Sequence, residues 1–319
     1  MTPLVRRIAQ RIGANLLLLL LLSLVVYLGV DMLPGDPITG ELGLTATPDQ
    51  IAAVRAHLGL DRPILARYAD WVAGVAHGDF GTSTSGRPVT DMLGDRVGNS
   101  IVLACLAIAI VVPLSLGLAV LAALHRDRAT DRALSTTTLL LVSVPEFVVA
   151  SGLVVIFAVN LRWLPAVSII PAGSRLLDHP DALALPVLAL ASTGTAYAFR
   201  VIRSTAATEL RASHVEFLRL SGATTTTVLR TAVVPAVLPV AVQCWLVTGV
   251  GLIGGAVLVE KVFSYPGIGE LLVTSTQSGD LPVVQALVLI LGAATLAVLT
   301  IADLAVRLLT PRLRTGTRG

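Results

Sequence analysis

Residues 231–259 read TAVVPAVLPVAVQCWLVTGVGLIGGAVLV, a stretch without Asp, Glu, Lys or Arg. A helix needs about 20 apolar residues to cross the hydrocarbon core of a bilayer, and this stretch exceeds that length. Similar blocks occur along the whole chain, and only one of them contains an acid, Glu146. The other blocks are Ile12–Val30, Val97–Leu124, Ala133–Leu161, Ala182–Phe199 and Leu281–Ala302. We therefore predict an all-α polytopic membrane protein with six transmembrane helices.

The composition of the chain supports the same class. Of its 319 residues, 55% are hydrophobic and 13% are charged, whereas a soluble domain carries about 25% charged residues. So few charges leave too little polar surface for a water-soluble globule. The arginines before Leu16–Leu22 resemble those of a secretory signal. However, the apolar run continues to Leu33 without a small-residue cleavage site, so we interpret it as a retained first span.

The basic residues predict the orientation of the chain. Six spans place both termini on one side, and most of the 23 basic residues fall in segments on that side. Cytoplasmic loops carry an excess of Lys and Arg, so both termini are expected in the cytoplasm. The net charge of +3 follows from this bias and gives no reason to expect a nucleic-acid partner.

The predicted spans divide the chain into successive parts. These are a cytoplasmic N-terminus at 1–11, a first transmembrane helix at 12–33, an extracytoplasmic subdomain at 34–96, a five-helix core at 97–309 that contains a cytoplasmic loop at 204–230, and a cytoplasmic tail at 310–319. The subdomain is expected either to contact a partner outside the membrane or to pack as a lid on the protein's own spans.

Two extracytoplasmic segments carry local structural signals. Within the subdomain, the pattern after Thr47 predicts an amphipathic helix, and Pro63–Ala76 predicts a second, short helix. Turns are expected at 78–81 and 85–88, where glycine and proline cluster. In the segment Glu260–Asp280, aromatic residues flank a Pro-Gly turn, which is typical of a membrane-interface or pore-mouth loop.

The cytoplasmic loop has the signals of a short, well-delimited helix. Ser213-His214-Val215-Glu216 fits the capping box, with a hydroxyl at the N-cap and a carboxylate three residues later. Gly222 supplies the left-handed conformation that ends a helix, so about two turns are expected. Thr224–Thr227 offers a new N-cap, and Pro235 and Pro239 predict a kinked entry into the fifth span.

Several kinds of chemistry are excluded by the sequence. The single lysine, Lys261, lies outside any Gly-Lys-Ser/Thr phosphate-binding loop, so this chain cannot bind ATP by that device. The histidines lack metal-ligand spacing, and no catalytic motif is present. Cys105 and Cys244 both lie inside apolar spans and are interpreted as membrane-buried residues. We therefore expect no enzyme activity, metal or cofactor in this chain, so ATP-driven transport would need energy from another chain.

Polar residues inside the spans are candidates for a translocation pathway. Glu146 follows Pro145 near the middle of the third span, where a charge costs about 2.5–3.5 kcal/mol on insertion scales. It is expected either to meet a cationic group of the solute, such as a peptide amino terminus, or to be a protonated or internally hydrogen-bonded acid. Gln243 and Thr248 in the fifth span are expected to line a pore or to hydrogen-bond a neighbouring helix.

Short motifs recur in order through nearly the whole chain and together form a specific pattern. They are Leu33-Pro34-Gly35-Asp36-Pro37, Leu58-Gly59-Leu60-Asp61-Arg62-Pro63, Gly78-Asp79-Phe80-Gly81, Ser85-Gly86-Arg87-Pro88-Val89, Trp163-Leu164-Pro165, Gly254–Glu260, Val262-Phe263-Ser264-Tyr265-Pro266-Gly267-Ile268-Gly269 and Leu281-Pro282-Val283-Val284-Gln285. This pattern resembles the dipeptide/oligopeptide and nickel permease family of ATP-binding-cassette (ABC) importers, on the branch of its first-named permease. The resemblance implies the type I ABC importer (MetI-like) permease fold.

The resemblance also implies a role for the cytoplasmic loop. Such importers carry a Glu-Ala-Ala…Gly signature whose short helix sits in a groove on the ATPase subunit. The matching positions here are Glu216-Phe217-Leu218 and Gly222, and both alanines are replaced. The implied ATPase-coupling helix comprises Ser213, Val215, Glu216, Phe217, Leu218, Arg219, Leu220 and Gly222.

The implied assembly contains a sister permease, most simply in a heterodimer, and two ATPase subunits that carry ATP and Mg. It also contains an extracytoplasmic solute-binding protein near 34–96, with Asp36, Asp61, Asp79, Glu260, Tyr265 and Pro266 in extracytoplasmic loops. The implied location is the bacterial cytoplasmic (inner) membrane, and the implied solutes are di- and oligopeptides. Nickel complexes and other small solutes, glutathione-like compounds among them, are alternatives. An ion-coupled secondary transporter would show an internal repeat, and we find none in the sequence.

Overall fold

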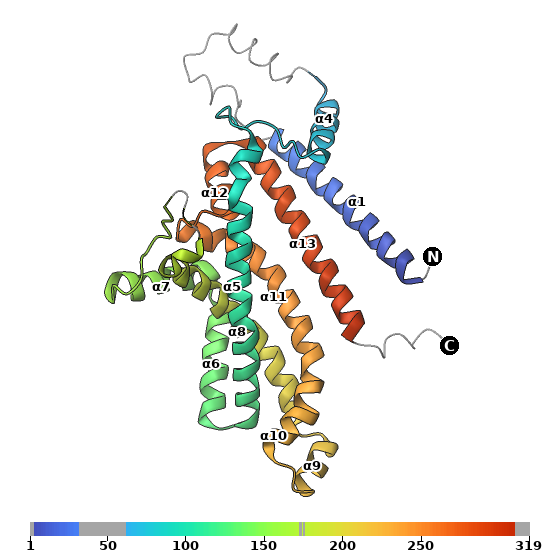
Figure 1. Ribbon diagram of the computed structural model, residues 1–319, viewed down its shortest axis with the longest axis vertical. Coiled ribbons are helices and arrows are strands. Elements are labelled where there is room, and N and C mark those ends of the chain that lie inside the picture. Colours follow the sequence, from blue (N-terminus) through green and yellow to red (C-terminus); the bar gives the residue numbers. More distant parts are fainter. Residues whose placement is uncertain (1–2, 32–61, 172–173, 175, 310–319) are drawn as a thin grey trace. The chain divides into compact units, whose positions relative to one another are not determined.

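The computed structural model describes residues 3–31, 62–171, 174 and 176–309. Its first helices are α1 (Pro3–Asp31), α4 (Ile64–Ala76), α5 (Val89–Leu124), α6 (Ala129–Ser143) and α7 (Glu146–Leu153), which continues as the π-helix η1 (Val154–Asn160) (Figure 1). Then follow η2 (Leu176–Asp178), α8 (Pro180–Glu209), α9 (Ser213–Leu220), α10 (Thr225–Val228), η3 (Leu229–Val233), α11 (Val234–Val262), α12 (Ile268–Ser278) and α13 (Leu281–Leu309). Outside these helices, the described residues contain one isolated bridge, between Thr82 and Pro88.

The helices confirm an all-α polytopic membrane protein. Five are long and apolar enough to cross a membrane, and a sixth span results if one bent pair of helices is counted as a single crossing. The five are Gln10–Gly29, Val89–Leu124, Pro180–Glu209, Thr225–Val262 and Leu281–Ala305. The chain forms two compact units, the first from Met1–Asn99 with Gly267–Leu296 and the second from Ser100–Pro266 with Ala297–Gly319.

The bent pair occupies the place of the predicted third span. We expected one continuous helix over Ala133–Leu161, but α6 and the helix that starts at Glu146 meet at an angle of 109°. Val144 has extended backbone angles, φ −106° and ψ 130°, because the ring of Pro145 disfavours a helical conformation in the residue before it. The sequence therefore predicted a span at this place but not the bend within it.

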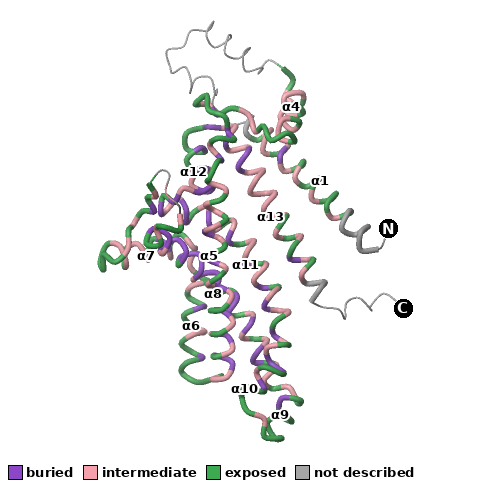
Figure 2. Tube along the Cα trace, viewed as in Figure 1, coloured by how far each residue is buried: buried purple, intermediate pink, exposed green. Residues whose placement is uncertain are grey.

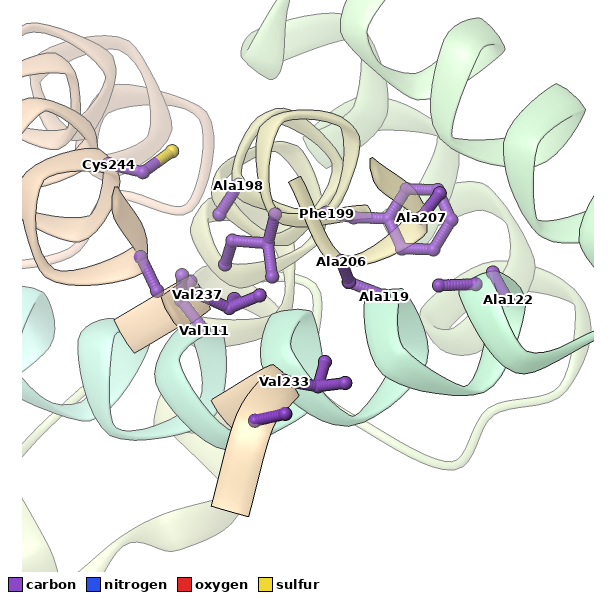
Figure 3. Packing of buried hydrophobic residues seen from close by; sticks show 14 of the residues in the cluster. Val111, Ala119, Ala122, Ala198, Phe199, Ala206, Ala207, Val233, Val237 and Cys244 are labelled. Atoms are coloured by element: carbon purple, nitrogen blue, oxygen red, sulfur yellow. The ribbon is translucent and has the colours of Figure 1, made fainter. Parts of the chain in front are cut away.

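The second unit is built around α8. Most of this helix is buried, as the purple stretch of Figure 2 shows. Figure 3 shows buried side chains of α5, α8 and α11 packed between these helices, among them Phe199 of α8, which is fully buried. Most of their neighbours are alanine or valine. Small side chains let transmembrane helices approach closely, and van der Waals packing then supplies much of their association energy.

Among the described glycines of the second unit, Gly194 of α8 leaves the least room for an added β-carbon. A β-carbon added there would lie 3.0 Å from Cγ2 of Val111 and 3.1 Å from Cγ2 of Thr248. We predict that Gly194→Ala destabilises the protein by about 1–3 kcal/mol through overpacking, measured by thermal unfolding in detergent micelles. Gly251→Ala is the matched control, because a β-carbon on that helical glycine meets nothing within 4 Å. Equal stability of the two variants would contradict the prediction.

The first unit confirms the short helix and the turns predicted before α5. The helix α4 begins directly after Pro63, whose ring favours the first turn of a helix. Tyr68 of α4 donates a hydrogen bond to the carbonyl of Leu20 at 3.0 Å and shares one with Ser23 of α1 at 2.8 Å. The expected helix after Thr47 lies outside the described residues.

Two acids hold parts of the first unit together. The buried carboxylate of Asp280 accepts hydrogen bonds from the hydroxyl of Ser83 and from the backbone N–H of Thr84, the latter at 3.2 Å. Glu270 of α12 pairs with Arg96 of α5 at 2.8 Å. These contacts join segments that lie almost two hundred residues apart in the chain.

The segment after α11 differs from the expected loop. Residues from Ile268 onward form α12, which ends at Gly279 in the left-handed conformation with φ 72°. The rings of Phe263 and Tyr265 are fully buried in the second unit, so they pack within the protein, and the membrane-interface or pore-mouth position of this segment stays a prediction. Burial, and then the nearby charge of Glu260, raise the pKa of the Tyr265 phenol above its usual range, so the phenol stays protonated at neutral pH.

Candidate coupling helix and transport cavity

The helix α9 has the predicted length and a different N-terminus. The N-cap is Ala212, and its carbonyl accepts hydrogen bonds from the N–H groups of Val215 at 2.9 Å and Glu216 at 3.2 Å. Ser213 is already the first helical residue, so its hydroxyl makes no capping hydrogen bond. The predicted capping box is therefore not formed.

The C-terminus of α9 is fixed by Gly222, as predicted. Its φ is +82°, which glycine adopts without the steric penalty of a β-carbon. The N–H of Gly222 donates to the carbonyl of Arg219 at 3.0 Å, and the N–H of Ala223 donates to the carbonyl of Leu218 at 3.0 Å. This pair of bonds is the Schellman motif, which satisfies carbonyls that would otherwise be unpaired at the end of the helix.

The surface of α9 divides into an anchored side and a free side. Val215 is fully buried in the core of the second unit, and Leu218 packs against that core. In contrast, Phe217 is 69% exposed and Leu220 is 81% exposed. Ser213, Glu216 and Arg219 are exposed beside them. The helix therefore presents apolar side chains at the lower end of the second unit in Figure 1, where they are available to a partner.

A short turn, 221–224, connects α9 to the helices that lead into the fifth span. The hydroxyl of Thr224 accepts a hydrogen bond from the N–H of Thr227 at 3.3 Å, which confirms the predicted N-cap. From Thr225 the chain is helical through α10, the π-helical turn η3 and α11. Pro235 lies in the first turn of α11, and Pro239 lies inside that helix. A displacement of α9 would therefore be transmitted to α11 through a short, capped connection.

An ion pair in the second unit was not predicted from the sequence. Arg203 of α8 donates two hydrogen bonds to the carboxylate of Asp131 at the start of α6. The same carboxylate accepts a bond from the N–H of Asp127 at 3.0 Å and one from Ser135 at 3.3 Å. Because the side chain of Asp131 is 3% exposed, the guanidinium is its main compensation for burial. The signal in the sequence was a pair of acids, Asp127 and Asp131, among the arginines of this turn.

Two of the predicted pathway residues line one cavity. It has a volume of about 500 Å³ in the second unit and lies beside the break between α6 and α7. Glu146 and Thr248 both line it, together with Thr193, Tyr197 and Gly251. The hydroxyl of Thr248 donates to the carbonyl of Cys244 at 2.9 Å. Gln243 is exposed on α11 and is not among the lining residues.

The residues predicted in extracytoplasmic loops fall in different surroundings. Asp79 is exposed in the first unit and accepts a hydrogen bond from the N–H of Gly81 at 2.9 Å. Glu260 and Tyr265 are buried in the second unit, where Ser100 donates to Glu260 at 2.6 Å. Pro266 is half-buried. Asp36 and Asp61 lie outside the described residues.

The comparisons with known proteins place the chain in one family of membrane proteins. Residues 115–315 match the family described as "Binding-protein-dependent transport system inner membrane component". Residues 4–116 match the N-terminal part of such membrane components. The chain belongs to this family. It is therefore a multi-pass inner-membrane permease subunit of an ABC importer, which confirms the resemblance seen in the sequence.

Relatives of this permease cover nearly all of its length. A putative peptide transport system permease protein of Brucella abortus is 33% identical over 96% of this chain and 98% of its own. A probable peptide ABC transporter permease of Sinorhizobium fredii is 30% identical over the same shares. The glutathione transport system permease of Salmonella choleraesuis is 33% identical over 93% of this chain and 94% of its own.

A solved structure supports the fold of this permease. The structure, titled as an amino acid ABC transporter with histidines, superposes with a TM-score of 0.53 and 18% sequence identity. The match covers 68% of this chain and 94% of the other chain. At this level of identity the similarity concerns the fold alone.

Proposed function

We propose that this permease takes up peptides and forms half of the translocation pathway. The support is that relatives of at least 30% identity over 96% of the chain are named as peptide permeases. A second candidate solute is glutathione, because the Salmonella choleraesuis permease is 33% identical over 93% of the chain. Both candidates share a peptide backbone and an amino group.

The observation that carries the coupling mechanism is the geometry of α9. The helix is closed at its C-terminus by Gly222, anchored by Val215 and apolar on its free side at Phe217 and Leu220. We propose that the free side binds an ATPase subunit. ATP and Mg would be held by that partner, and closure of the ATPase would move α9 and α11 together as a rigid body.

The proposed assembly contains this permease, a sister permease, two ATPase subunits and a solute-binding protein on the outer side. A sister permease is expected because six spans supply half of a pore. The arginine distribution supports cytoplasmic termini and a cytoplasmic α9. The extracytoplasmic segment at 34–96 is proposed to meet the solute-binding protein.

The coupling proposal predicts what purifies with a tagged chain. In the double variant Phe217→Glu and Leu220→Glu, the recovery of ATPase subunits should fall at least about tenfold. The two apolar side chains would be buried in the proposed interface, and the variant replaces them by charges. The sister permease should still copurify. Recovery is measured by quantitative mass spectrometry after gentle solubilisation.

The matched control keeps both side chains apolar. Phe217→Tyr with Leu220→Met should recover the ATPase subunits as the wild type does, since the contact area is largely retained. Full recovery of the ATPase with the double Glu variant would show that α9 is a structural loop helix. Purification of the wild-type chain without any ATPase, together with ion-driven uptake in liposomes, would reject the importer proposal itself.

A further inference from the structure

The cavity beside the broken third span contains one charge. Of the described residues that line it, Glu146 is the single ionisable acid or base apart from the phenol of Tyr197. Its side chain lies against the backbone of α11, because a β-carbon on Gly255 would be 3.5 Å from the Glu146 carboxyl carbon. The carboxylate is therefore placed between α7 and α11, next to a space of about 500 Å³.

Within the described residues, no hydrogen bond or ion pair compensates the Glu146 carboxylate for its removal from water. Across the described part of the chain, Glu146 makes no hydrogen bond and no ion pair, in contrast to the buried Asp131 with its guanidinium partner. Glu146 is the first residue of α7, and the helix dipole favours an acid there. That effect is weak and offsets only part of the cost of a charge within a membrane span. The second expectation from the sequence was a protonated or internally hydrogen-bonded acid, and the described residues do not form the internal hydrogen bond.

The other polar groups of the cavity are placed to receive a cation. The hydroxyls of Ser143, Thr193 and Thr248 donate to carbonyls of their own helices, so their free lone pairs are acceptors. Tyr197 is 43% exposed, and a tyrosine ring attracts an ammonium group through its face. A carboxylate, three acceptor hydroxyls and an aromatic ring match an ammonium group and do not match an anion.

We propose that Glu146 binds the ammonium group of the transported solute, which for a peptide is its amino terminus, as the solute passes through this cavity. The identification of the solute as a peptide rests on the proposed function, whereas the cation site rests on the cavity alone. The contact is a charge-assisted hydrogen bond, among the stronger kinds available to a partly buried carboxylate. Glu146 thus selects solutes with a free amino group at the permease.

Binding to the purified complex tests the cation site without reference to transport. Alaninamide carries an ammonium group and no carboxylate, and N-acetylalaninamide is its uncharged counterpart. At about pH 6.5, below the α-amino pKa of about 7.7–8.0, the first probe is charged. Alaninamide should raise the thermal unfolding temperature of the wild-type complex in nanodiscs, and N-acetylalaninamide should leave it unchanged.

Variants then assign that effect to one side chain. Glu146→Gln should weaken alaninamide binding about ten- to hundredfold, as expected for the loss of a charge-assisted hydrogen bond. Glu146→Asp retains the charge and should bind with intermediate affinity. The matched control is Asp181→Asn, because Asp181 also lies in the first turn of a helix but is exposed and outside the cavity. A wild-type response to both probes alike, or an unchanged response in Glu146→Gln, overturns the cation site.

Uptake of radiolabelled trialanine by cells that depend on this importer tests the link to the solute. The wild type and Asp181→Asn should take up trialanine equally, and Glu146→Gln should show at least about a tenfold loss of kcat/KM. Equal uptake by Glu146→Gln overturns the proposed role in transport. Absence of uptake by the wild type rejects the peptide function, while the alaninamide measurement still decides whether the cavity binds a cation.

Discussion

Replacement of Arg203 by alanine is expected to destabilise the second unit by about 3–5 kcal/mol, because it leaves the buried carboxylate of Asp131 without its charged partner. The Asp131 carboxylate is 3% exposed and would lose two of its hydrogen bonds. The bonds from Asp127 and Ser135 would remain, but neither carries a positive charge. We expect a large decrease in the thermal unfolding temperature of the purified complex. We also expect a smaller amount of this permease in the membrane.

The double variant Asp131→Leu with Arg203→Met serves as the control. Apolar residues in place of both charges are often neutral or stabilising, since the cost of burying the charges disappears with them. We therefore expect the double variant to recover most of the lost stability. If Arg203→Ala and the double variant are equally unstable, the shape of the arginine side chain, and not the compensation of Asp131, holds α6 against α8.

Gly222→Pro is expected to reduce ATP-dependent uptake at least about tenfold, which corresponds to an effect of about 1.4 kcal/mol or more. Proline fixes φ near −65° and has no N–H, whereas Gly222 has φ +82° and donates to the carbonyl of Arg219. The last turn of α9 would therefore unwind, and Phe217 and Leu220 would lose their fixed positions. The measurement is initial uptake of trialanine in cells with matched amounts of membrane-inserted permease.

Gly222→Asn provides the matched comparison. Asparagine is the residue that most often replaces glycine at such a helix end, because it tolerates the left-handed region. It should retain most of the uptake, while Gly222→Pro should not. If both variants transport at the wild-type rate, a fixed end of α9 is unnecessary for coupling.

Local signals predicted the elements that depend on neighbouring residues. Uncharged stretches predicted the long helices because the length of an apolar run sets whether it can span a bilayer. Pro63 and Thr224 predicted helix starts, and Gly222 predicted a helix end, since each residue acts through its own backbone or its own hydroxyl. The predicted capping box at Ser213 is wrong, because Ala212 takes the N-cap position and its carbonyl accepts the hydrogen bonds of the first turn.

Features that depend on distant partners were not predictable in this way. Asp131 and Arg203 are 72 positions apart, and nothing local distinguishes Arg203 from the neighbouring arginines of the chain. Phe263 and Tyr265 are aromatic residues beside a turn, which favours a membrane interface, yet the tertiary fold buries both. For the candidate site, the sequence predicted Glu146 and Thr248 as pathway residues. Their meeting at one cavity followed from the bend at Pro145, whose angle no local signal specifies.

The bend at Pro145 also has a consequence for how the chain enters the membrane during synthesis. The 15 residues of α6 extend about 22 Å at 1.5 Å per residue, which is less than the hydrocarbon thickness of about 30 Å. The arm beyond Pro145 is equally short. We therefore expect neither arm to be retained as a span on its own, and we expect stable integration of this region only once α8, which packs against both arms, has been synthesised.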